Sequence, residues 1–163
     1  MVSGSPVMMA EVEALIRRNS AMNIELFGRV NSDDIDLHLR HAAHTVLEHV
    51  LRSDRLWLSR ITGRGSEVDV AYRDLPSLWE ARKDEDARIE NVLLLGLGDV
   101  NTLIAYESAR KQCIEPVIVC VFRMINHQVN HQWKLEVACK RGRAGRITDN
   151  DLLRDVQRCL HLL

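Results

Sequence analysis

Two histidines, His127 and His131, have the spacing in this chain that is most informative about chemistry. They stand four residues apart in a segment of helical periodicity, so their imidazoles should lie on one helix face, about one turn apart. Two imidazoles so placed can bind one metal ion, because zinc–nitrogen bonds of about 2.0–2.1 Å require such convergence. The simpler alternative is that each ring hydrogen-bonds a backbone carbonyl or a facing carboxylate, since apolar surroundings make unpartnered imidazoles costly.

A third metal ligand would have to come from another helix. The segment 35–62 contains four histidines: His38, His41, His44 and His49. His49 is flanked by Val46 and Val50, so we expect it to face inward, whereas His41 and His44 lie in a more polar run. His49 is therefore the favoured third ligand and His44 the second choice.

Several other chemistries are excluded by residue type. Zincins need a glutamate directly after the first histidine, and Gln128 at that position cannot accept a proton. The chain has no G-x-S-x-G motif, no repeated Glu-x-x-His pair and no phosphate-binding glycine loop. The four cysteines form no CxxC pair, so we expect small buried apolar side chains: Cys113, Cys120, Cys139 and Cys159. No catalytic residue is identified.

The composition is that of one soluble domain spanning residues 1–163. Apolar residues make up 46% and charged residues 28%, with a formal net charge of -1. This balance argues against direct nucleic-acid binding and against an anionic membrane surface as partner. No apolar stretch approaches the roughly 18–20 residues of a membrane span, and residues 1–6 lack the features of a signal peptide, so we expect a cytoplasmic protein.

The segments that contain the histidines, and those that pack against them, are predicted to be long helices. Apolar spacing predicts helices over about 8–27, 35–62 and 116–140, the last ended by Gly142. A third helix in chain order should start at a capping box formed by Ser77 and Glu80, and end at Gly96.

The connection over 101–115 is long for a bundle, and either a long crossover or an added hairpin, with a strand over 102–106, would explain it. The fold class expected is therefore all-α, a four-helix bundle with a long crossover connection and a short C-terminal helix starting near Thr148. Near the end of the second helix, we expect Trp57 and Arg60 to be structural and Asp54 to form a surface ion pair with Arg55 or Arg60.

Two motifs carry a family resemblance. His49 is followed by Asp54-Arg-Leu-Trp57-Leu-Ser-Arg60-Ile-Thr-Gly63, and Asn126-His127-Gln128-Val-Asn-His131 comes later. Together they resemble the DinB (damage-inducible) family of bacterial proteins, over about residues 23–159. The resemblance implies a four-helix bundle with a long crossover, a homodimer, and a divalent metal ion held by His49, His127 and His131. Members of the wider superfamily include S-transferases and isomerases that use low-molecular-weight thiols, and many members have no assigned activity.

The chain departs from the family after the last histidine. The family commonly continues His-Arg-Gly-Gln, whereas this chain reads His131-Gln132-Trp133-Lys134, so the bulky Trp133 should change helix packing or a dimer contact. The implied function is a divalent-metal-binding bundle protein acting as a metal-dependent thiol transferase or hydrolase, with zinc, nickel or iron as the ion. The alternative is a non-catalytic bundle that acts through a dimer or partner interface, with structural histidines.

A small-molecule thiol is favoured over hydrolysis because no carboxylate base stands beside the histidine pair. Glu48 adjoins His49 in sequence but points about 100° away around the helix. A metal can itself deprotonate a coordinated thiol, so a thiol substrate needs no such base.

Overall fold

The computed structural model describes residues 6–64, 71–96, 98–108 and 111–143. They form four long helices, which are α1 (Pro6–Val30), α2 (Leu37–Thr62), α3 (Leu75–Glu90) and α4 (Val117–Arg143). A π-helical turn, η1 (Asn91–Leu95), extends α3, and the strands β1 (Leu103–Ser108) and β2 (Lys111–Pro116) pair antiparallel. The mainly helical class is thus confirmed, and the connection before α4 contains the hairpin that was one of the two expectations. The expected C-terminal helix near Thr148 lies outside the described residues.

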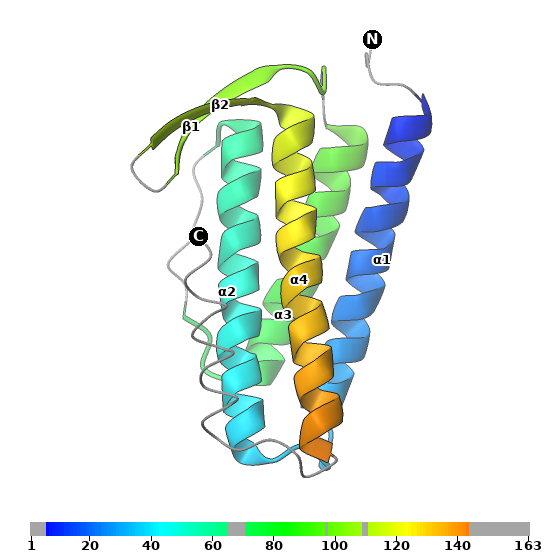
Figure 1. The fold of residues 1–163 in the computed structure, drawn as a ribbon, viewed down its shortest axis with the longest axis vertical. Helices are drawn as coiled ribbons and strands as arrows, with labels where there is room; N and C mark the ends of the chain where they lie inside the picture. Colours follow the sequence, from blue (N-terminus) through cyan, green and yellow to red (C-terminus); the bar gives the residue numbers. More distant parts are fainter. Residues whose placement is uncertain (1–5, 65–70, 97, 109–110, 144–163) are drawn as a thin grey trace.

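The four helices lie side by side, with the hairpin across one end (Figure 1). α4 packs against α1 and α2, and α3 packs against the same two helices. In Figure 1, α2 and α3 run toward the hairpin end, whereas α1 and α4 run away from it. No helix in the described ranges is both long and apolar enough to cross a membrane.

The helix ends follow capping chemistry, with two departures from the sequence predictions. Asp36 caps α2 by accepting a hydrogen bond from the Leu39 amide at 2.9 Å. The capping box of α3 pairs Asp74 with Ser77, so α3 begins earlier than the expected Ser77–Glu80 box; a carboxylate at Asp74 already satisfies the Ser77 amide at 2.8 Å. The expected stop at Gly142 is also wrong, because α4 continues through that glycine to Arg143.

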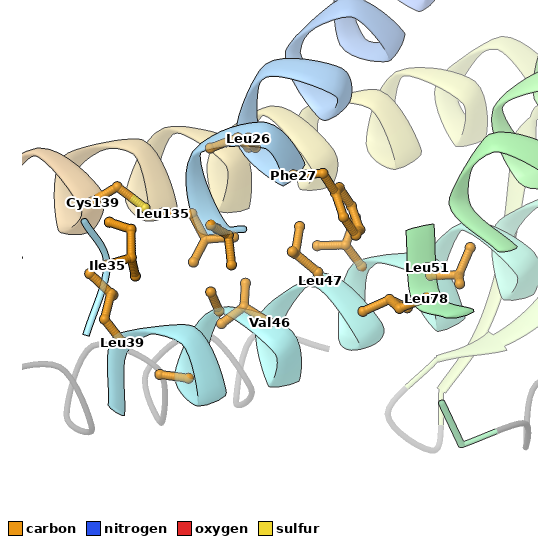
Figure 2. Close-up of a cluster of buried hydrophobic side chains, with 14 residues drawn as sticks. Leu26, Phe27, Ile35, Leu39, Val46, Leu47, Leu51, Leu78, Leu135 and Cys139 are labelled. Carbon is orange, nitrogen blue, oxygen red and sulfur yellow. The ribbon is translucent and has the colours of Figure 1, made fainter. Parts of the chain in front are cut away.

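Two separate apolar clusters fill the interior. The cluster away from the hairpin joins α1, α2 and α4 with one residue of α3 (Figure 2), and includes Leu26, Phe27, Leu39, Leu47, Leu78 and Leu135. The cluster at the hairpin end includes Val12, Ile16, Trp57, Leu58, Leu93, Val121 and Met124. On every helix, buried polar residues separate the two clusters. A polar layer therefore crosses the middle of the interior.

The side chain of Arg60 on α2 links this helix to the hairpin. The Arg60 guanidinium lies 4.7 Å from the ring centres of both Trp57 and Tyr106, and its Nη2 donates to the carbonyl oxygen of Glu107 at 2.8 Å. On β2, Glu115 accepts a hydrogen bond from the Tyr106 hydroxyl at 2.5 Å. The structural roles expected for Trp57 and Arg60 are confirmed, and the hairpin is held over the end of the bundle.

Candidate metal centre

Three histidines from two packed helices converge on one point. His127 and His131 come from one face of α4, and His49 comes from the facing side of α2. The ring centres lie 5.3 Å apart for His49 and His127, 5.1 Å for His49 and His131, and 4.4 Å for His127 and His131. The sequence prediction that His49 joins the pair on the last helix is thus matched by the geometry.

The ring nitrogens are close enough to share one ion. One nitrogen from each of the three rings lies within 4.8 Å of the others, and the Nε2 atoms of His127 and His131 are 3.0 Å apart. Two nitrogens bound to one tetrahedral zinc ion would lie about 3.4 Å apart, given bonds of about 2.0–2.1 Å. The donor set consists of nitrogen alone, which suits zinc, nickel, iron or copper.

The rings carry buried nitrogen atoms without hydrogen-bond partners among the described residues. These atoms are Nε2 of His49 and Nδ1 of both His127 and His131. The alternative, in which each imidazole is satisfied by a carbonyl or a facing carboxylate, therefore does not describe these rings, apart from the single contact between His127 and His131. The unpartnered Nε2 of His49 fits a site that binds an ion, whereas the Nδ1 atoms of His127 and His131 lie on the other side of rings whose Nε2 atoms already meet at 3.0 Å.

The three imidazoles are neutral near pH 7. Burial, followed by the neighbouring His49 and Lys134, lowers the pKa of His127 to about 4. Burial and the other two imidazoles, with Lys134, lower the pKa of His131 to about 3. Burial and then Arg52 lower the pKa of His49. Neutral rings keep the nitrogen lone pairs that metal binding requires.

The cluster supplies three candidate metal ligands, and two of its rings are partly exposed. No aspartate, glutamate or cysteine among the described residues joins the group of three. His131 is only 1% exposed, whereas His49 and His127 are partly exposed. Three protein ligands are the number found at catalytic rather than structural zinc sites.

The other histidines named from the sequence lie elsewhere. His41 and His44 line a separate pocket of about 610 Å³, formed by the first half of α2 and the segment before α3. His44, the second choice as ligand, is therefore not part of the cluster. Cys120 is buried in the apolar cluster at the hairpin end, and Cys139 in the other one, as expected for small apolar side chains. His161 and Cys159 lie outside the described residues.

No family model, curated protein or solved structure matches the chain. The DinB resemblance thus remains a prediction carried by the two motifs, and the metal centre depends on the geometry described above.

Directly behind the histidines lies a buried polar layer that the sequence analysis did not identify. Asp54 is 0% exposed and Arg82 is 2% exposed, and the two form an ion pair at 2.5 Å. Gln128 donates to the same carboxylate at 2.7 Å and accepts from the Asn19 amide at 2.8 Å. The expected surface pair of Asp54 with Arg55 or Arg60 is therefore wrong, because this face of α2 packs against α3 and α4.

The electrostatics of the layer reflect its burial. Burial raises the pKa of Asp54 to about 6, despite the opposing effects of Arg82 and Gln128. Burial alone would lower the pKa of Arg82, but the carboxylates of Asp54 and Asp86 outweigh it and raise that pKa. Arg82 also pairs with Asp86 at 2.6 Å, so one guanidinium links two carboxylates.

The layer fixes the rotation of α4 about its axis. Each histidine of the cluster on α4 is followed directly by a buried glutamine, Gln128 after His127 and Gln132 after His131. The Gln132 amide donates to the Asn23 side-chain oxygen at 2.8 Å. Adjacent residues point about 100° apart on a helix, so glutamines held inside the bundle turn both imidazoles toward α2. The sequence feature that could have identified these buried glutamines is the pattern His-Gln-x-x-His-Gln over residues 127–132.

Proposed function

We propose that this protein binds one divalent metal ion through His49, His127 and His131. The observation that carries the proposal is the convergence of three neutral imidazoles, with one nitrogen of each within 4.8 Å of the others. The 3.0 Å approach of the Nε2 atoms of His127 and His131, and the unpartnered buried Nε2 of His49, support it. With three protein ligands, the site matches catalytic zinc sites, which keep a fourth position for an exchangeable ligand.

We further propose that the chain is a DinB-like bundle with a crossover between α2 and α3. Both helices run toward the hairpin end in Figure 1, so the end of α2 and the start of α3 lie at opposite ends of the bundle. This differs from the expectation that the crossover lies between the third and fourth helices, where the structure has the hairpin. The proposed topology agrees with the fold that the resemblance implies.

The activity that fits the site best is transfer or isomerisation involving a small thiol. A divalent ion in the site would act as a Lewis acid that lowers the pKa of a coordinating thiol or water. Glu48, the carboxylate next to His49 in sequence, accepts hydrogen bonds from Arg52 and from the Tyr72 amide. It is therefore engaged elsewhere and is poorly placed as the general base that hydrolysis of a neutral substrate would need.

The proposal is tested by metal content. The full chain, purified without a histidine tag or chelator and reconstituted with zinc, should hold about one ion per chain. A His127→Ala/His131→Ala variant should lose it, whereas a His41→Ala/His44→Ala control, which removes two histidines outside the cluster, should keep it. Absence of bound zinc, nickel and iron after reconstitution with each ion would refute the metal site.

The second candidate is a non-catalytic bundle that works through an interface with a second copy of the chain. Phe122, Val129 and Trp133 are exposed on one face of α4, and Trp133 is 61% exposed. The bulky residue at position 133 therefore points to the surface and leaves the bundle interior unchanged. We predict that Trp133→Glu converts a homodimer into monomers without lowering the melting temperature of the monomer, as measured by sedimentation and circular dichroism. An unchanged sedimentation coefficient in the variant would exclude this face as the interface.

A further inference from the structure

Two cations follow histidines of the cluster at helical spacing. Arg52 follows His49 by three residues on α2, and Lys134 follows His131 by three residues on α4. Residues three apart share a helix face, and helical side chains lean toward the N-terminal end of their helix. Lys134 is therefore directed toward His131, whereas the guanidinium of Arg52 pairs with Glu48 at 3.0 Å.

The electrostatic effects on the imidazoles agree with this placement. After burial, Arg52 is the neighbour that lowers the pKa of His49. Lys134 contributes, after burial and the other imidazoles, to the lowered pKa of His127 and of His131.

The positive charge around the cluster is only partly compensated. Nη2 of Arg52 donates to Glu48 at 3.0 Å, while its Nε is buried without a hydrogen-bond partner among the described residues. Lys134 forms no ion pair within the part of the chain that the structure describes. The imidazoles themselves bring no negative charge, so two added charges from a divalent ion would leave the site strongly positive.

We propose that the centre takes a small organic anion, a molecule whose carboxylate lies beside the ion and is held by Lys134. The inference rests on the proposed function and narrows its substrate class: a thiol substrate of this site would also carry a carboxylate. A positive, partly buried site discriminates strongly between an anion and its neutral analogue.

The probe is acetate, with acetamide as a neutral molecule of the same shape. The full chain is loaded with cobalt(II), whose visible absorption reports on its coordination, and each probe is titrated at constant ionic strength. We expect a saturable spectral change with acetate and none with acetamide at equal concentrations. Lys134→Met should weaken acetate binding about tenfold, and Lys134→Arg should largely restore it. The matched control is Lys140→Met, because Lys140 lies on the same helix and pairs with Glu136 at 2.8 Å.

The outcomes separate this inference from the proposed function. If the unmodified protein gives no cobalt spectrum, both are refuted. If cobalt binds with one ion per chain but acetate leaves the spectrum unchanged, or acts equally on Lys134→Met and on the unmodified protein, only the anion site is refuted. An unchanged cobalt stoichiometry in Lys134→Met shows that the variant is folded.

Discussion

Replacement of Arg82 by methionine should destabilise the protein in a way that depends on pH. Arg82 is 2% exposed and its partner Asp54 is 0% exposed, so the substitution leaves a carboxylate buried without its cation. Breaking a buried ion pair from one side costs about 3–5 kcal/mol. At about 2–4 °C per kcal/mol for a domain of this size, the melting temperature should fall by about 6–20 °C at pH 8.

The sign of the pH dependence follows from Asp54. Its native-state pKa, already raised to about 6 by burial, should rise further when Arg82, which lowers it, is removed. A carboxyl group whose pKa is raised in the native state binds more protons in the native than in the unfolded state. The destabilisation caused by its buried charge is therefore complete above the native pKa. It shrinks as pH falls toward the unfolded pKa near 3.8. The difference between the unmodified protein and Arg82→Met should therefore be smaller at pH 5 than at pH 8.

Urea unfolding of the metal-free proteins at pH 5 and pH 8 measures this difference. Asp54→Asn combined with Arg82→Met should recover part of the loss at pH 8, because no buried charge then remains in that pair. The control is Arg88→Met on the same helix, where a half-exposed arginine pairs with Glu85 at 3.6 Å and should contribute less than about 1 kcal/mol. A loss below 1 kcal/mol for Arg82→Met, or one that is equal at both pH values, would refute this reasoning.

Three further predictions concern the site and the hairpin. The metal-free protein should lose stability as pH falls from about 7 to 4. The pKa values of His127 and His131 are about 4 and 3 in the native state but near 6.5 in the unfolded state, so the unfolded state binds more protons over this range. Urea unfolding at several pH values in this range measures the loss. Gln128→Leu should weaken zinc binding at least tenfold and leave the helix content unchanged, because Gln128 belongs to the polar layer that orients the histidines. Competition with a chromophoric chelator measures the zinc affinity, and circular dichroism measures the helix content. A zinc affinity equal to that of the unmodified protein would contradict the role assigned to the polar layer. Arg60→Ala should lower the free energy of unfolding by about 1 kcal/mol, because it removes the guanidinium stacked on Trp57 and Tyr106. It should also speed amide hydrogen exchange in β1 and β2 more than in α1. An equal increase in exchange in the strands and in α1 would contradict a role of this stacking in holding the hairpin.

The sequence was sufficient to predict the helices and the three converging histidines. Apolar periodicity located three of the four helices, and capping residues located α3. The four-residue spacing of His127 and His131 placed both rings on one face. His49 could be preferred to His44 as the third histidine because Val46 and Val50 flank it. Apolar neighbours at helical spacing indicate the face of a helix that is buried.

The polar layer was not predictable in the same way. Asp54 stands beside Arg55 in the sequence, and a charged pair of this kind is usually a solvated surface feature. Its burial depends on Arg82 and Gln128, which come from two other helices and whose approach is a property of the tertiary fold. The start of α3 was misplaced because Ser77 and Asp74 are both good caps, and local sequence does not decide between them.

The central claim is that three imidazoles share one ion, and X-ray absorption at the zinc edge tests it most directly. For the reconstituted full chain we predict three nitrogen neighbours at about 2.0–2.1 Å with the outer-shell scattering of imidazole rings, and one further light ligand. A spectrum with fewer than two imidazoles, or with sulfur at about 2.3 Å, would contradict the site formed by His49, His127 and His131.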